Sequence, residues 1–214
     1  MRLFAGLVLR DLRLALTGGA WLPLAFFLLV AILFPFGVGP DSVLLARTGG
    51  GVLWIAALLA ALLPVERLFA QDAENGVLDQ LTIRGVSEEL IVLAKWVAHW
   101  LSFGPLLMLA AIPAAAMLSL DGDTLIKLEL GLAIATPALA ALGIMAASLT
   151  LGLRRAGALA GLIMLPLAVP LLIFGAASLA PLPGNALMLL AAVSVFLCAI
   201  TPFAAGAAIR ASRD

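Results

Sequence analysis

Residues 14–40 read LALTGGAWLPLAFFLLVAILFPFGVGP, and none of these 27 side chains carries a charge. A hydrocarbon core about 30 Å thick is crossed by roughly 20 helical residues, so this stretch is long enough to span a membrane once. Of the 214 residues in the chain, 64% are hydrophobic and 11% are charged, and the mean hydropathy is +1.22. A soluble domain carries about 25% charged residues. The composition therefore predicts an all-α polytopic membrane protein.

Charge-free gaps recur along the chain and set the expected number of spans. The later gaps hold 18, 25, 24 and 54 residues and begin after Arg47, Lys95, Glu129 and Arg155. The last gap is too long for one helix, and residues 181–185, PLPGN, form a turn cluster that divides it in two. The sequence thus predicts a single transmembrane domain over residues 1–214, with six spans at about 18–36, 48–65, 96–119, 130–153, 156–179 and 186–209.

Lysine and arginine are divided unevenly between the alternate loops that these spans define. Cytoplasmic loops of membrane proteins carry an excess of these two residues. Both chain ends are therefore expected in the cytoplasm. The opposite side receives Arg47 and Lys127, and the cytoplasmic side receives Arg2, Arg10, Arg13, Arg67, Arg84, Lys95, Arg154, Arg155, Arg210 and Arg213.

Residues 1–16 are predicted to form a helix that lies in the cytoplasmic interface rather than a seventh span. At 100° per residue, Arg2, Arg10 and Arg13 share an arc of roughly 80°, and apolar side chains cover much of the rest. Such a helix turns its basic side chains toward lipid head groups. Asp11 projects into the apolar arc, and because an unpaired carboxylate there is costly, we expect it to face protein. The alternative is a basic flank that only sets orientation.

Residues 66–95 form the largest segment expected outside the membrane, in a cytoplasmic loop between the second and third spans. Six acidic residues oppose three basic ones in this segment, so its formal charge is −3. Asn75-Gly76 offers a helix stop, because glycine accepts the left-handed cap conformation. Ser87, followed by Glu88 and Glu89, predicts a helix N-cap with acidic residues in the first turn. We expect one or two short helices across the cytoplasmic face and then a helix that enters the third span.

Motifs that carry catalytic chemistry are missing from the sequence. A phosphate-binding loop needs Gly-Lys followed by Ser or Thr, but neither of the two lysines, Lys95 and Lys127, follows a glycine. One cysteine and zero net charge predict no cysteine metal site, no disulfide framework and no nucleic-acid partner. His99 is a candidate to bind haem or a metal. The simpler interpretation places it near the cytoplasmic interface, beside Trp96 and Trp100 as belt residues.

The acidic segment carries a resemblance to a known class of membrane protein. Residues 74–81, ENGVLDQL, resemble the E-x-G-T-L-E-Q-L segment of permeases of the ABC-2 type of ABC transporters, where it belongs to the helices that dock on the ATPase. Within that class the chain most closely resembles the CcmB family, the membrane permease subunits of the cytochrome c maturation haem exporter. Arg84-Gly85 departs from the pattern, since such permeases often have a proline there. The matching stretches are RDLRLA (10–15), ERLF (66–69), EL (89–90), LAK (93–95), AHW (98–100), LTLGLRR (149–155), LPLAVPLLIFG (165–175) and TPFA (201–204).

This resemblance implies a function and a set of partners. It implies a permease fold like that of ABC-2 or type V exporters, in the bacterial cytoplasmic (inner) membrane, with haem as substrate and no cofactor of its own. The chain is then no enzyme by itself, because a separate ATPase subunit in two copies binds and hydrolyses ATP. Further partners are a second copy of the chain, small haem-handling membrane proteins and a haem chaperone. The residues expected to couple to the ATPase are Glu66, Arg67, Asp72, Glu74, Gly76, Asp79, Gln80 and Arg84.

Other functions compete with this reading. ATP hydrolysis serves haem export in one version and release of the haem-loaded chaperone during c-type cytochrome maturation in another. An ABC-2 permease for a different hydrophobic substrate and a static membrane assembly scaffold are the nearest alternatives. A membrane enzyme that acts on lipids needs a polar cluster at one face, for which Asp121, Asp123 and Glu129 are sparse candidates.

Overall fold

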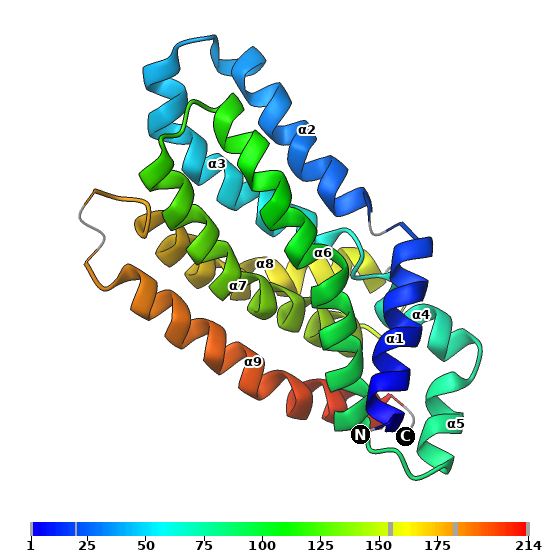
Figure 1. The fold of residues 1–214 in the computed structure, drawn as a ribbon. Helices are drawn as coiled ribbons and strands as arrows, with labels where there is room; N and C mark the ends of the chain where they lie inside the picture. The colour runs from blue at the N-terminus through cyan, green and yellow to red at the C-terminus, as the bar shows by residue number, and fades with distance from the viewer. Residues whose placement is uncertain (1, 20, 154–155, 182–183, 213–214) are drawn as a thin grey trace.

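A computed structural model describes residues 2–19, 21–153, 156–181 and 184–212, and the regular structure in these ranges is helical throughout (Figure 1). Within the described residues, six helices are long and apolar enough to cross a membrane, which confirms the predicted all-α, multi-pass class. The helices are α1 (Arg2–Thr17), α2 (Trp21–Val38), α3 (Ser42–Leu62), α4 (Arg67–Glu74), α5 (Val77–Ile83), α6 (Glu88–Met117), α7 (Gly122–Leu149), α8 (Ala156–Ala177) and α9 (Ala186–Ala211).

Several helices begin earlier than the predicted spans, because polar residues cap them outside the apolar stretch. α3 begins at Ser42 rather than near 48, and the Asp41 side chain accepts two backbone hydrogen bonds at its start. α6 begins at Glu88, before the apolar span predicted from about 96 and at the N-cap predicted at Ser87. The hydroxyl of Ser87 accepts a hydrogen bond from the backbone N–H of Leu90 at 3.4 Å. Counting from charged residues finds the apolar part of a helix and misses its capped first turns.

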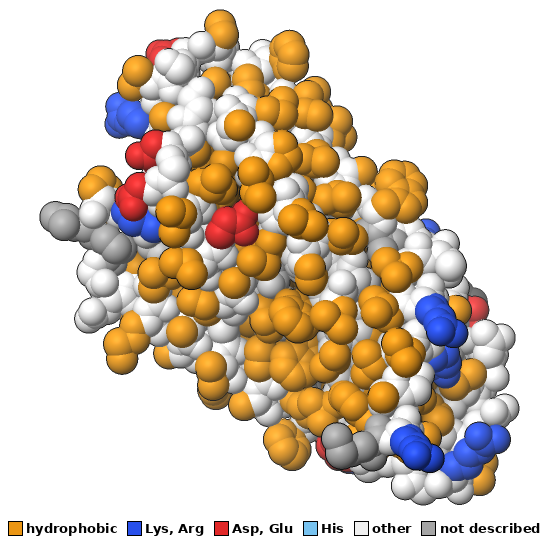
Figure 2. Space-filling view, viewed as in Figure 1, with side chains coloured by type: hydrophobic (Ala, Val, Ile, Leu, Met, Phe, Trp, Pro, Cys, Tyr) orange, Lys and Arg blue, Asp and Glu red, His pale blue; other side chains and the backbone are white. Residues whose placement is uncertain are grey.

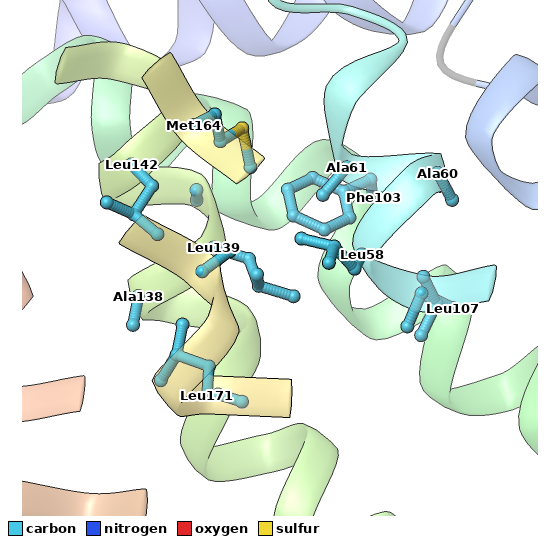
Figure 3. Close-up of a cluster of buried hydrophobic side chains, with 14 of the residues drawn as sticks. Leu58, Ala60, Ala61, Phe103, Leu107, Ala138, Leu139, Leu142, Met164 and Leu171 are labelled. Atoms are coloured by element: carbon cyan, nitrogen blue, oxygen red, sulfur yellow. The ribbon is translucent and has the colours of Figure 1, made fainter. Parts of the chain in front are cut away.

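α7 occupies the middle of the bundle and contacts α3, α6, α8 and α9. Its buried face is rich in alanine and glycine, which lets neighbouring helices approach closely inside a membrane. Figure 3 shows where α3, α6, α7 and α8 meet, around the side chains of Leu58, Phe103, Leu107, Leu139, Leu142, Met164 and Leu171.

Trp54 fills the junction of α3, α7 and α8, where two glycines make room for its ring. A Cβ atom added at Gly131 would lie 2.7 Å from the Trp54 ring, and one added at Gly175 would lie 2.6 Å from it. The indole is fully enclosed. The absence of a side chain at both glycines therefore lets the backbone of α7 and α8 lie close to the indole.

The surface is divided by polarity along the bundle. Figure 2 shows a wide band of hydrophobic side chains, with basic side chains gathered at the end of the molecule that carries α4 and α5. We call this the α4–α5 end. The first turn of α1 and the last turn of α9 lie there too (Figure 1). Arg154, Arg155 and Arg213 of the orientation argument, and Leu182 and Pro183 of the predicted turn, lie outside the described residues.

Candidate functional site

The α4–α5 hairpin is a short helical pair closed by a glycine turn. α4 stops at Asn75, whose side-chain amide donates to the backbone carbonyl of Gln71 at 2.8 Å. Gly76 follows with φ of +66°, in the left-handed region that favours glycine, and α5 begins immediately after it. The predicted helix stop at Asn75-Gly76 is confirmed, as is the N-cap at Ser87 that starts α6 after the hairpin.

The hairpin has a buried apolar face and an exposed polar face. Phe69 and Leu78 are buried against the bundle and join its hydrophobic core. Of the expected coupling residues, Gly76 is half-buried and Asp72 is buried. The remaining members of that set are exposed: Glu66, Arg67, Glu74, Asp79, Gln80 and Arg84.

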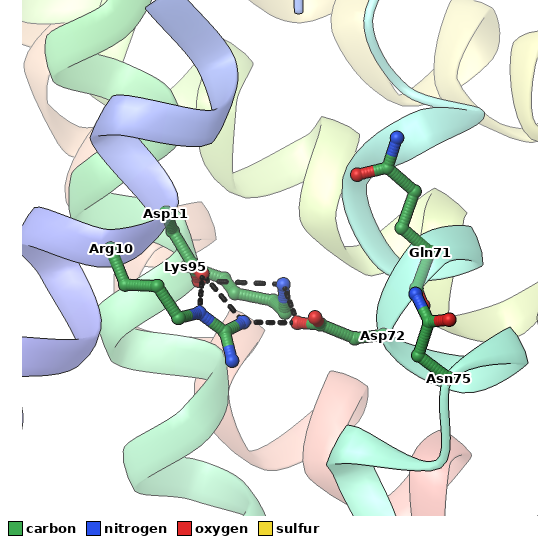
Figure 4. Close-up of polar contacts among 6 residues, drawn as sticks. All are labelled: Arg10, Asp11, Gln71, Asp72, Asn75 and Lys95. Carbon is green, nitrogen blue, oxygen red and sulfur yellow. Dashed lines mark hydrogen bonds and ion pairs between the residues drawn. The ribbon is translucent and has the colours of Figure 1, made fainter. Parts of the chain in front are cut away.

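Asp72 points away from the exposed face into a cluster of four charged side chains, shown in Figure 4. Its Oδ2 atom lies 2.5 Å from Lys95 Nζ and 2.5 Å from Arg10 Nη2. Asp11 completes the set, with Oδ1 2.7 Å from Arg10 Nη2 and Oδ2 3.3 Å from Lys95 Nζ. We call Arg10, Asp11, Asp72 and Lys95 the ion cluster. It joins α1, α4 and α6, which are far apart in the sequence.

Because the ion cluster is largely buried, each of its charges needs a partner of opposite charge. The side chains of Lys95, Asp72 and Asp11 are 8%, 9% and 11% exposed, and that of Arg10 is 33% exposed. Two positive and two negative groups balance, so no buried charge is left without an opposite partner. Burial lowers the pKa of the Arg10 guanidinium, but the charges and hydrogen bonds of Asp11 and Asp72 more than offset this and raise it above its ordinary value.

The ion cluster confirms the expectation for Asp11 and differs from the expectation for Arg10. Asp11 faces protein, as predicted, because it pairs with Arg10 and Lys95. Arg10 was expected on the basic arc toward head groups with Arg2 and Arg13, but it turns to Asp72 instead. Arg2 and Arg13 are exposed. One guanidinium of that arc therefore serves a contact inside the protein.

Two further contacts hold α4 in place. The Lys95 ammonium lies 5.3 Å from the centroid of the Phe69 ring, a distance suited to a cation–π contact. Arg67 Nη1 donates to the backbone carbonyl of Gly18 at 2.8 Å, which ties the start of α4 to the turn between α1 and α2. The hairpin is thus attached to the bundle on both sides of its first helix.

A second ionic contact joins the first turn of α6 to the last turn of α9. Arg210 Nη1 lies 2.6 Å from Glu89 Oε1 and 3.5 Å from Glu88 Oε2. Gly206, one turn earlier on α9, leaves room for Glu89, since a Cβ atom there would lie 3.2 Å from Glu89 Oε1. α6 therefore receives ionic contacts from α1, α4 and α9 at the α4–α5 end.

The two tryptophans that were expected as belt residues bond to α7 through their indole N–H groups. Trp96 donates its indole N–H to the backbone carbonyl of Pro137 at 2.8 Å, and Trp100 donates to the hydroxyl of Thr136 at 3.1 Å. Both partners lie on α7. The indole N–H groups therefore fasten α6 to α7 instead of facing lipid head groups, because a partner inside the bundle satisfies them.

His99 is buried between α6 and α7. It is 3% exposed, its ring lies 4.9 Å from that of Phe103, and its Nε2 atom has no hydrogen-bond partner among the described residues. A Cβ atom on Gly143 would lie 3.3 Å from Nε2. No group of three or more metal-binding side chains occurs in the described ranges. His99 thus stands as a single imidazole buried within the protein.

The acidic residues at the opposite end do not gather into one site. Asp121 caps α7 by accepting from the backbone N–H of Thr124 at 3.0 Å. Hydrogen bonding to the side chain and then to the backbone of Thr124 lowers the pKa of Asp121. Asp123 pairs with Lys127 at 2.8 Å, one turn along the same helix. Glu129 keeps a buried Oε1 atom without a partner among the described residues. Two of these three carboxylates therefore have structural partners of their own.

Comparison with known proteins matches the whole described bundle. The family model described as CcmB protein matches residues 2–212. Relatives named heme exporter protein B include that of Rhodobacter capsulatus, 47% identical over 95% of this chain and 97% of the relative. That of Bradyrhizobium diazoefficiens is 41% identical over 100% of both chains, and that of Escherichia coli K12 is 41% identical over 94% of this chain and 95% of its own. The chain belongs to the CcmB protein family.

Proposed function

We propose that this chain is the membrane-spanning permease subunit of an ABC transporter that exports haem. The relatives are named heme exporter protein B and align with nearly the full length of this chain, which supports the transfer of that role. The structural observation that carries the proposal is the α4–α5 hairpin. It presents a polar face to its surroundings and is tied through Asp72 to α1 and α6.

In this proposal the exposed face of the hairpin docks on the ATPase. Glu66, Glu74, Gln80 and Arg84 lie on that face, and the sequence holds no phosphate-binding loop, so ATP is bound and hydrolysed by the partner subunit. The chain itself is not the enzyme. Asp72 does not contact the ATPase in this account, because it is buried on the opposite face.

The ion cluster is the route by which movement of the hairpin reaches the spans. A displacement of α4 pulls Asp72 away from Lys95 on α6 and Arg10 on α1, unless both helices move with it. Separating these buried charges is costly, since each would be left without its partner. The hairpin, α1 and the first turns of α6 therefore move as one unit.

The finer assignments follow the family resemblance. We propose two copies of the ATPase, a second copy of this chain, small haem-handling membrane proteins and a haem chaperone as partners in c-type cytochrome maturation. The location is the bacterial cytoplasmic membrane, with both chain ends in the cytoplasm and α1 in the interface. ATP hydrolysis drives haem export or release of the haem-loaded chaperone. The clustering of basic side chains at the α4–α5 end supports this orientation (Figure 2).

Charge reversal on the hairpin tests the docking. Each variant is co-expressed with the ATPase and purified in mild detergent. Glu74→Lys should bring down several-fold less ATPase than wild type does, and the double variant Glu74→Lys with Asp79→Lys should bring down less than the single variant. The matched control is Asp123→Lys, an equal charge change on an exposed carboxylate of α7 at the other end of the bundle. Wild-type ATPase recovery with the double variant, at normal membrane insertion, would contradict the proposed docking.

A further inference from the structure

A cavity of about 350 Å³ lies beside the ion cluster and is not accounted for by the proposed docking. Its walls come from α1, the turn before α2, the end of α3, α4 and α6. This volume is in the range of small-ligand pockets. Its polar side includes Arg67, Gln71 and Lys95, and its apolar side includes Leu14, Leu22 and Leu63.

The charged side chains that line the cavity are two acids, Asp11 and Asp72, and two bases, Arg67 and Lys95. Asp11, Asp72 and Lys95 line it, but these three groups and Arg10 neutralise one another within the ion cluster. Among the charged residues that line the cavity, Arg67 is the one that makes no ion pair within the described residues. Its Nη1 donates to the backbone carbonyl of Gly18. A guanidinium has five N–H donors, so others remain for a ligand. Arg67 is therefore the group at this cavity that can bind an anion.

The apolar side of the cavity is open to the hydrophobic surroundings of the bundle. Leu14, Leu22 and Leu63 line it and remain 48%, 40% and 37% exposed. These side chains come from α1, α2 and the end of α3, so they border a gap between three helices. A ligand whose head sits at Arg67 can therefore lay a hydrocarbon chain over these leucines, with favourable burial of apolar surface.

The cavity lies at the level expected for lipid head groups. It adjoins the first residues of α2 and the last residues of α3, the ends of two helices able to span a membrane. Trp21, the first residue of α2, is exposed at the same level, a position that tryptophan favours at the membrane–water interface. Basic pockets between membrane helices at this depth suit anionic lipid head groups.

We propose that this cavity binds an anionic phospholipid, with its phosphate at Arg67 and an acyl chain over Leu14, Leu22 and Leu63. The cavity combines an unpaired guanidinium, an apolar exit and a position at the ends of the spans. A free phosphate ion needs only the guanidinium, whereas a phospholipid uses all three features. A bound lipid then bridges the turn before α2 and the first residue of α4. This inference does not depend on the proposed transport function.

The test is native mass spectrometry of the purified full chain with phosphatidylglycerol, and with zwitterionic phosphatidylethanolamine as reference. We expect wild type to retain phosphatidylglycerol preferentially, and Arg67→Gln to lose about fivefold in affinity, the effect of one basic residue near a membrane surface. Arg67→Lys keeps the charge but not the planar fork, so it should retain most of the affinity. Arg47→Gln removes an exposed arginine on α3 outside the cavity and should bind like wild type.

Three results would overturn the proposal. Equal loss in Arg67→Gln and Arg47→Gln would show general attraction of lipid to basic residues and no site. Equal retention of the two lipids by wild type would remove the preference for an anionic head. Full competition by glycerol phosphate, which has the head group and no acyl chain, would assign the cavity to a soluble phosphate compound.

Discussion

Lys95 Nζ on α6 lies 2.5 Å from Asp72 Oδ2 on α4, and both side chains are more than nine-tenths buried. The contact joins the hairpin that projects from the α4–α5 end to a helix able to span a membrane. A buried ion pair adds little to the free energy of unfolding, because the cost of removing both charges from water offsets their attraction. Removal of one partner is costly, since it leaves a buried charge uncompensated. The contact is therefore suited to keep two elements together while they move.

Removing the lysine should destabilise the protein strongly. In Lys95→Met, Asp11 and Asp72 are left with Arg10 as their one basic partner in the cluster, and a buried pair broken in this way costs about 3–5 kcal/mol. The expected result is a clear fall in the melting temperature in detergent. Lys95→Arg keeps the charge and serves as control. A melting temperature for Lys95→Met equal to wild type would show that the cluster is hydrated and unimportant.

Removing both members of the pair should be less damaging than the sum of the single changes. Lys95→Met with Asp72→Asn leaves Arg10 and Asp11 as a neutral pair, so no charge is stranded. The double-mutant cycle on melting temperature should show a favourable coupling between the two sites. Additive effects of the two changes would mean that Lys95 and Asp72 act independently.

Gly175→Ala should disturb the junction around Trp54. The added Cβ lies 2.6 Å from the indole, and overpacking of this kind costs about 1–3 kcal/mol. Gly161→Ala on the same helix is the matched control, since no atom lies within 4 Å of its added Cβ. Thermal unfolding in detergent should therefore separate the two variants. Equal melting temperatures would show that Trp54 shifts without strain.

Gly76→Ala should loosen the hairpin. Gly76 has φ of +66°, and an L-residue in that conformation costs about 1–2 kcal/mol. Hydrogen exchange at the amides of α4 and α5 should become faster. Gly6→Ala on α1, where the added Cβ meets nothing within 4 Å, should leave that exchange unchanged. Unaltered exchange in Gly76→Ala would show that the turn relaxes to another conformation.

Arg210→Gln should have a smaller effect than Lys95→Met. The guanidinium side chain of Arg210 is 48% exposed, and water replaces the lost contacts with Glu88 and Glu89 more easily than in the ion cluster. A fall in melting temperature as large as that of Lys95→Met would contradict this ranking. High salt should weaken the Arg210 contact more than the ion cluster, because exposed pairs are screened more strongly.

Much of the fold is present in the sequence because it rests on local signals. The charge-free stretches place the apolar helices, and Ser87 and Gly76 mark a helix start and a helix stop that the structure confirms. The first turns of α3 were missed because its cap at Asp41 lies outside the apolar stretch, whereas the early start of α6 was predicted from Ser87. Local chemistry thus predicts where helices exist better than where they begin.

The sequence predicted only part of the ion cluster, because the residues that form it are far apart in the chain. Asp11 was expected to need protein around it, but nothing local connects residue 11 with residue 72. A usable signal was present in α6. Since Ser87 starts that helix, Lys95 lies two turns inside it, after the apolar residues 90–94, and requires a buried partner. The hydrogen bonds of Trp96 and Trp100 were missed for the same reason, as their acceptors on α7 are distant in sequence.

Site-specific cross-linking can detect the proposed docking of the hairpin on an ATPase. Cys198 is the single cysteine, so a Cys198→Ser background allows one new thiol at a time. A bifunctional cross-linker should join Gln80→Cys on α5 to the co-expressed ATPase subunit, while Asp123→Cys at the opposite end should give no such product. Absence of the product from both Gln80→Cys and Glu74→Cys, in a complex that still hydrolyses ATP, would contradict the proposed docking of the hairpin on the ATPase.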